Sequence, residues 1–501
     1  MKIKTSKRMI DVIGLFILTL TIIMFAFLIR GKNFNRIDQQ GLDSQHPGPI
    51  RTTDREWREI FFKEKKVGYS VGSINAVNDG YFLQDEIFLR LNLTGFSSDV
   101  HTVTQANLDD KYLLRNFYFK MTSGVVSYVI TGKVKGEELE IETPFRKKKE
   151  IQKIKLQKTP LIGAGLGFYF KGKRVKIGDY FSFPIFDPST NAQQNARIRV
   201  TAREKININR KSYDVFRLET ELWGKSMIFW IDDKGNTLKE EGLMGLTVVK
   251  SRPANAPLDL EHGEEIDFYD LASVDTNKKL ANPERLSYLK IALDGFEKVK
   301  FDRDKINSGR QSLKDNILEI KKEAIPREAS LSVSLINNNP ALSSFLKPEF
   351  NIESDDPEII SKSREIIGST KDPLIAARKI MGWVYHKLEK KPVVSVPNAL
   401  EVLRSRVGDC NEHATLMTAL LRASNIPAKL CVGLVYTRGR FFYHAWNEAY
   451  LGRWMTIDAT VNQMPADVTH IKLLEGNLDK QVELTKIIGV LNIKVLDYEY
   501  D

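Results

Sequence analysis

Cysteine is scarce in this chain. Cys410 and Cys431 are the only two among 501 residues, so they can form at most one disulfide bridge. No HExxH motif and no CxxC pair occurs, and two cysteines cannot complete a zinc site by themselves. The sequence therefore predicts no disulfide framework and no metal site, and we expect no cofactor.

Charge of one sign dominates only weakly. The formal net charge is +11, a modest excess for a chain of this length, and no nucleic-acid-binding module is recognisable. We expect no nucleic-acid partner and interpret the excess as a charged, solvated surface. A protein that faces anionic lipid or polymer would have the same bias, and the basic stretch Arg146–Lys149 is open to both interpretations.

One long apolar run is present near the N-terminus. Val12–Ile29 contains eighteen residues without a charge, which is enough to span a bilayer, and basic residues flank it on both sides. It lacks the small-residue cleavage site of a signal peptide, which favours an uncleaved transmembrane helix within residues 1–30 over the alternative of a cleaved signal peptide. The flanking charges favour a cytoplasmic N-terminus. The prediction is a single-pass membrane protein whose bulk is extracytoplasmic, either periplasmic or at the cell surface.

The rest of the chain predicts an α+β protein with several folded units, because single cores rarely exceed about 250–300 residues. Residues 31–54 are typical of a linker. Residues 55–252 contain alternating apolar and polar runs separated by turn residues, which predicts a large antiparallel β region. The remaining expectations are a linker and β-rich connecting region at 253–354, a catalytic domain at 355–475, and a C-terminal strand or tail at 476–501.

The domain at 355–475 begins with helix signals. Asp372 followed by Pro373 predicts a helix start, and Asn398 with Glu401 has the spacing of a capping box. A third helix is expected over 410–424, and strand-forming segments follow it. Three helices followed by antiparallel strands make an α+β unit.

Cys410 is the first candidate for chemistry. Gly408 permits a sharp turn and Asp409 suits a helix N-cap, which places the thiol in the first helical turn. The helix dipole stabilises a thiolate there, and the free N–H groups of that turn can hold an oxyanion. Because the carboxylate of Asp409 opposes thiolate formation, we expect that a base is also needed.

His444 and Asp458 are the candidates for the base and its partner. If the turn falls at Leu451–Arg453, a simple hairpin centred on residue 451 pairs His444 directly with Asp458. The acid would then orient one ring nitrogen and leave the other for Cys410. Each residue alone has an ordinary structural explanation, as a buried cysteine, a core histidine or a turn aspartate. Their order and spacing together favour a catalytic site.

The segments around these residues resemble the bacterial transglutaminase-like superfamily, which is related in fold to papain-like cysteine proteases. The resemblance covers about residues 360–475 and implies that Cys410 is the nucleophile, His444 the general base and Asp458 its orienting partner. Ala459 stands where the family often has proline. The segments that carry the resemblance are NALEVL (398–403), GDCNEHA (408–414), ASNIPA (423–428), YHAWNE (443–448) and WMTIDAT (454–460).

Four further residues near these motifs receive interpretations. Glu412 and His413 resemble supporting positions of the family, turned away from the nucleophile. Trp446 is interpreted either as a wall of the cleft or as core packing. Cys431 lies among apolar strand residues and is interpreted as a buried apolar residue.

Two functions remain open at this point. The first is a cysteine enzyme that acts on peptide or amide bonds through an acyl-thioester, with hydrolysis favoured over acyl transfer. Its partner would be a protein or peptide substrate, with cell-wall peptide among the candidates. The second is a non-catalytic protein of the cell envelope that uses the same fold for binding or as a scaffold. The sequence does not identify a substrate.

Overall fold

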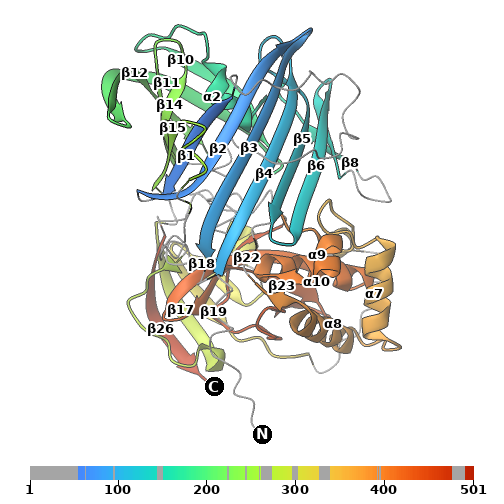
Figure 1. The fold of residues 1–501 in the computed structure, drawn as a ribbon. Helices are drawn as coiled ribbons and strands as arrows, with labels where there is room; N and C mark the ends of the chain where they lie inside the picture. The colour runs from blue at the N-terminus through green and yellow to red at the C-terminus, as the bar shows by residue number, and fades with distance from the viewer. Residues whose placement is uncertain are drawn as a thin grey trace. The chain divides into compact units, whose positions relative to one another are not determined.

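The computed structural model describes residues 55–501 with gaps (Figure 1). The predicted membrane helix, the linker at 31–54 and the basic stretch at 146–149 lie outside the described residues. The described chain divides into two compact units, one before and one after residues 266–267. The gaps are 63, 94–95, 144–150, 223–224, 243–244, 259, 261–272, 296–302, 308, 327–338, 392, 394–395 and 477–490.

Among the described residues, no helix is both long enough and apolar enough to cross a membrane.

The first unit is a single sheet of fifteen strands, as the alternating sequence predicts (Figure 1). Its order is β8-β7-β6-β5-β4-β3-β2-β1-β15-β14-β13-β12-β11-β10-β9, so the last strand of the unit returns to pair with the first. The pairing of β9 with β10 is parallel, in contrast to the antiparallel pattern predicted for the region. The strands are β1 (Glu56–Phe62), β2 (Lys65–Val77), β3 (Gly80–Leu93), β4 (Phe96–Leu108), β5 (Leu114–Ser123), β6 (Val126–Lys135), β7 (Glu138–Glu142), β8 (Ile151–Lys155), β9 (Leu161–Ile162), β10 (Tyr180–Asp187), β11 (Ala192–Ile208), β12 (Lys211–Leu222), β13 (Lys225–Ile231), β14 (Thr237–Glu241) and β15 (Leu246–Ser251).

The second unit combines helices with two main sheets (Figure 1). In one sheet the order is β16-β23-β22-β25, with β24 paired to β23, and in the other it is β18-β19-β17-β26. The C-terminal strand thus pairs with a strand from the connecting region. The strands are β16 (Ser273–Val274), β17 (Leu286–Asp294), β18 (Gln311–Lys314), β19 (Ile317–Lys321), β20 (Glu389–Lys390), β21 (Val407–Gly408), β22 (Ala428–Thr437), β23 (Arg440–Tyr450), β24 (Trp454–Ile457), β25 (Ile471–Glu475) and β26 (Asn492–Tyr500).

The predicted helix starts are confirmed. Asp372 accepts hydrogen bonds from the first turn of α8, and Asn398 accepts one from Glu401 N at the start of α9. Side-chain oxygens at these positions satisfy backbone N–H groups that have no partner within the helix. The helices of this unit are α4 (Arg303–Ile306), α6 (Pro340–Ser344), α7 (Pro357–Ile367), α8 (Pro373–Lys387), α9 (Ala399–Ser405) and α10 (Cys410–Ala423).

The helix α10 forms the centre of this unit. Its residues from Cys410 to Arg422 are all buried, and it packs against α7, α8 and α9 on one side and against β22 and β23 on the other. A helix that is buried on all sides has its position fixed by every neighbour. The start of α10 and the middle of β23 are therefore held together by the core.

Candidate active site

The first turn of α10 positions Cys410. Asp409 is the N-cap, and its Oδ1 accepts a hydrogen bond from Asn411 N at 3.2 Å. Glu412 completes a capping box, because its Oε2 accepts from Asp409 N at 3.0 Å. The predicted cap at Asp409 is confirmed, and Cys410 is the first residue of the helix.

Gly408 has a different role from the one predicted. It lies in β21, and its backbone does not adopt the left-handed conformation that favours glycine at sharp turns. A Cβ atom added at Gly408 would stand 2.3 Å from Cβ and 2.4 Å from Cγ of Glu412. The glycine is required because the side chain of Glu412 passes this close to the backbone, and not because the chain turns.

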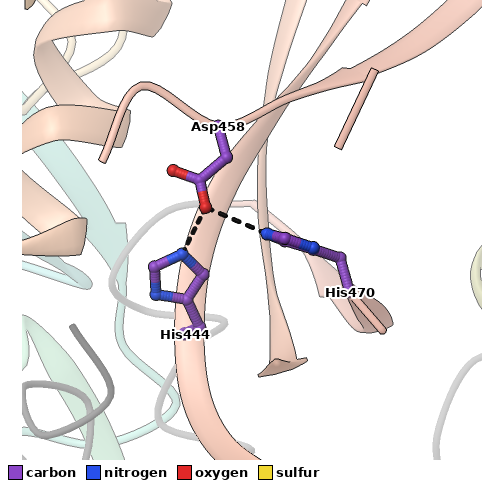
Figure 2. Close-up of side chains that lie close together, drawn as sticks. All are labelled: His444, Asp458 and His470. Carbon is purple, nitrogen blue, oxygen red and sulfur yellow. Dashed lines mark hydrogen bonds and ion pairs between the residues drawn. The ribbon is translucent and has the colours of Figure 1, made fainter. Parts of the chain in front are cut away.

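His444 and Asp458 are brought together, as Figure 2 shows. The Nε2 atom of His444 lies 2.6 Å from Oδ2 of Asp458, and both side chains are buried. Asp458 Oδ1 accepts a second hydrogen bond from Thr460 N at 2.7 Å. Since Nε2 is directed at the carboxylate, Nδ1 is the ring nitrogen left for another partner.

The predicted register of the hairpin is wrong by two residues. The turn at 451–453 is as expected, but Tyr450 pairs with Trp454 and Asn447 with Ile457, which centres the hairpin on Gly452. His444 is therefore not opposite Asp458, which follows the end of β24 and bridges to Gln463. A shift of two keeps the same face of the sheet, so the two side chains still meet.

Cys410 lies beside β23, in surroundings that disfavour the thiolate. Its thiol is fully buried and accepts a hydrogen bond from the backbone of Ala445, the residue after His444. Burial, together with the carboxylates of Asp409 and Glu412, raises the pKa of Cys410 well above its usual range. The sequence predicted a lowered pKa from the helix start, and the raised pKa follows because desolvation of the charged form outweighs that effect.

A hydrogen-bonded link holds β23 against α10. The side-chain amide of Asn447 donates to the carbonyl of Ala414 at 2.9 Å and to Oγ1 of Thr418 at 2.7 Å. All three groups are buried, so these bonds form without competition from water. Asn447 lies three residues after His444, and it therefore helps fix the distance between the helix that carries Cys410 and the strand that carries His444.

His470 is a site residue that sequence reasoning missed. Its Nε2 lies 3.0 Å from Asp458 Oδ2 (Figure 2). Its Nδ1 lies 3.3 Å from Oδ1 of Asp467. Burial lowers the pKa of His470, but Asp467 and Asp458 outweigh burial and raise it to about 9. Burial raises the pKa of Asp458, and His444 and His470 more than reverse this and hold it well below its usual range. No motif or spacing in the sequence points to residue 470.

Among the described residues, His444, Asp458 and His470 form a cluster of possible metal ligands. One ligand atom from each lies within 4.8 Å of the others. In a tetrahedral zinc site with bonds of about 2.0–2.1 Å, ligand atoms stand roughly 3.3 Å apart. The observed N···O distances of 2.6 and 3.0 Å are shorter than this ligand spacing and are ordinary for hydrogen bonds to a carboxylate. A proton on each histidine nitrogen therefore explains the two contacts.

The remaining predicted residues have defined places. Glu412 caps the helix, and His413 lies 2.6 Å from the carbonyl of Asp409 through Nδ1, so both support the helix start. Trp446 is buried and packs near the rings of His444 and His470, with centroid distances of 6.1 and 5.3 Å. Cys431 is buried in β22, and both cysteines are free, which confirms the interpretation of Cys431.

Comparisons with known proteins agree with the domain at this site. Residues 360–459 match the model of the Transglutaminase-like superfamily, and no curated protein sequence matches the chain. A candidate cysteine protease from Cytophaga hutchinsonii is 17% identical, with 43% of this chain and 86% of that chain covered at a TM-score of 0.27.

Two further solved structures are similar. A candidate protease from Parabacteroides distasonis is 13% identical, with 80% of this chain and 66% of that chain covered at a TM-score of 0.22. A β-barrel-like protein of a domain of unknown function from Brucella abortus is 12% identical, with coverages of 39% and 94% and a TM-score of 0.30. The chain thus consists of a large β-sheet region followed by an α+β domain, and residues 360–459 are a transglutaminase-like superfamily domain.

Proposed function

We propose that this protein is a membrane-anchored, extracytoplasmic cysteine enzyme that acts on peptide or amide bonds. The observation that carries the proposal is the buried hydrogen bond between His444 Nε2 and Asp458 Oδ2, 2.6 Å long. This bond fixes the imidazole and leaves Nδ1 for the thiol of Cys410. The thiol is close to His444 along the chain of contacts, because it accepts a hydrogen bond from the backbone of Ala445, the next residue in β23. A cysteine, a histidine and an orienting acid are the groups that activate a thiol nucleophile.

Each residue has a role in the proposed reaction. His444 takes the proton of the Cys410 thiol, and the sulfur attacks the carbonyl carbon while the carbonyl electron pair moves to oxygen. Backbone N–H groups at the start of α10 stabilise that oxyanion. The intermediate collapses, the C–N bond breaks, and the amine leaves with the proton from His444. Asp458 stabilises the imidazolium throughout.

The acyl-thioester that remains can react in two ways. Water, deprotonated by His444, gives a carboxylic acid and restores the thiol, whereas an amine gives a new amide. We favour hydrolysis because the proteins that the sequence resembles are commonly hydrolases. The substrate class that we propose is a protein or peptide outside the cytoplasm, with cell-wall peptide among the candidates, because the apolar run at 12–29 would hold the enzyme there.

The second candidate is a non-catalytic protein of the cell envelope. The raised pKa and the complete burial of Cys410 favour it, because a nucleophile needs both ionisation and access. The two candidates differ in one observable: in an enzyme the reactivity of Cys410 depends on His444, and in a scaffold it does not.

Alkylation by iodoacetamide, mapped to each cysteine by peptide mass, separates the candidates in the full-length protein. Cys431 is the internal control, because it is equally buried and its pKa is also raised by burial. We expect Cys410 to react roughly tenfold faster than Cys431 near neutral pH, and His444→Ala to abolish the difference. Equal rates for the two thiols, unchanged by His444→Ala, would favour the scaffold.

A further inference from the structure

We propose that His470 is a positioning residue that fixes the Asp458 carboxylate toward His444 and offsets part of its negative charge. The inference rests on the proposed function, because it concerns how the same pair of residues is tuned. Its basis is the geometry of one carboxylate that is shared by two imidazoles (Figure 2).

Every hydrogen bond of the Asp458 carboxylate fixes its orientation. Oδ2 lies 2.6 Å from His444 Nε2 and 3.0 Å from His470 Nε2, and Oδ1 accepts from Thr460 N at 2.7 Å. Rotation of the carboxyl group would break all three contacts in a buried site, where no water replaces them. Without His470, Oδ2 would depend on His444 alone.

The second ring nitrogen of His470 determines its charge. Nδ1 lies 3.3 Å from Oδ1 of Asp467, so both ring nitrogens face carboxylate oxygens. An ionised carboxylate only accepts hydrogen bonds, and an imidazole that donates from both nitrogens is a cation. The pKa of His470, raised to about 9, agrees with this assignment.

Asp467 is itself held in place. Its Oδ1 accepts from Thr469 N at 2.9 Å and from Thr469 Oγ1 at 2.6 Å, and its Oδ2 accepts from Gln463 Nε2 at 3.0 Å. Burial raises the pKa of Asp467, and His470 outweighs burial and lowers it to about 2. Asp467 is therefore an anion at neutral pH and keeps His470 protonated.

Arg310 fixes the backbone that carries these two residues. Its guanidinium donates to the carbonyls of Ala466, of Asp467 at 2.8 Å and of His470 at 3.1 Å. Three carbonyls within five residues are thereby tied to one buried side chain, 4% exposed, that directly precedes β18. The segment 466–470 is therefore held by a side chain that lies outside residues 360–459, the part of the chain that matches the superfamily.

The charge of His470 acts on the groups around it. The ring centroids of His444 and His470 are 5.7 Å apart. A positive charge in this cluster favours thiolate at Cys410, so it moves the titration of that thiol to lower pH. His470 itself faces the charged or titratable groups of Asp458, Asp467 and His444. The other titratable and charged groups around these residues are Cys410, His413, Lys390 and Arg310.

The test is the pH profile of Cys410 alkylation in the full-length protein, with His470→Gln as the main variant. Glutamine keeps a hydrogen-bond donor for Asp458 but carries no charge. We expect the rise of the alkylation rate with pH to move upward by roughly one pH unit, because unit charges within one buried cluster interact by that order of energy. Asp467→Asn should move this rise in the same direction, and the exposed His386→Gln is the matched control.

The outcomes separate the inference from the function on which it rests. A profile that depends on His444 but keeps its wild-type position in His470→Gln would overturn the inference and leave the function standing. Reactivity of Cys410 that does not depend on His444 would overturn the function itself. Thermal unfolding of each variant shows whether it is folded, and a variant that is destabilised without a shift of its profile contradicts a positioning role.

Discussion

Gly408→Ala should destabilise the protein strongly, although it adds a single methyl group. That methyl would stand 2.3 Å from Cβ, 2.4 Å from Cγ and 3.0 Å from Cδ of Glu412. Overpacking of this kind costs about 1–3 kcal/mol, and loss of a helix cap costs about 0.5–2 kcal/mol. Because displacement of Glu412 would break its bond to Asp409 N, both costs apply, and we expect a loss of about 2–4 kcal/mol.

The assay is urea unfolding of Gly408→Ala beside Gly382→Ala. Gly382 lies inside α8, and nothing stands within 4 Å of a Cβ added there. Alanine at that position should be neutral or should stabilise the protein by about 0.5–1 kcal/mol, because glycine is a poor helix former. The variant Glu412→Ala should not rescue Gly408→Ala, since the Cβ contact remains. An unfolding free energy of Gly408→Ala within about 0.5 kcal/mol of wild type would show that Glu412 does not need glycine at position 408.

Three further predictions concern the surroundings of the site. Asn447→Ala should lower the free energy of unfolding by about 1–3 kcal/mol, measured in urea, because it removes two buried hydrogen bonds between β23 and α10. Arg310→Met should increase amide hydrogen exchange at 466–470 while β22 stays protected; unchanged exchange would contradict the role of Arg310. The raised pKa of His470 contributes stability that is fully present below about pH 6.5 and lost as pH rises through about 9. We expect about 3 kcal/mol over that window, and a flatter curve in His470→Gln.

The sequence predicted the elements around the site because their signals are local. Asp372, Asn398 and Asp409 cap helices in the structure, and each signal depends only on a few neighbouring residues. Alternation with a period of two was sufficient for the large sheet, although the return of β15 to β1 is a contact between residues far apart in the chain. Local patterns contain no information about such pairings.

The site itself was predicted in part. The contact between His444 and Asp458 was predicted correctly although the predicted register was wrong by two residues. A shift by an even number of residues leaves each side chain on the same face of the sheet. His470 could not be found, since its contact with Asp458 is made by tertiary packing and follows no motif. The pKa of Cys410 was predicted in the wrong direction because burial, which a sequence does not give, outweighs the helix start.

The proposed chemistry requires that Cys410 forms an acyl-thioester with help from His444. The most direct measurement treats the full-length protein with p-nitrophenyl acetate, an ester that needs no knowledge of the natural substrate, and locates the acetyl group by peptide mass. We expect an acetyl group on Cys410 that forms in the wild type, is lost slowly to water, and is absent in His444→Ala. Acetylation of lysines alone, or acetylation of Cys410 at the same rate in His444→Ala, would contradict the proposed chemistry.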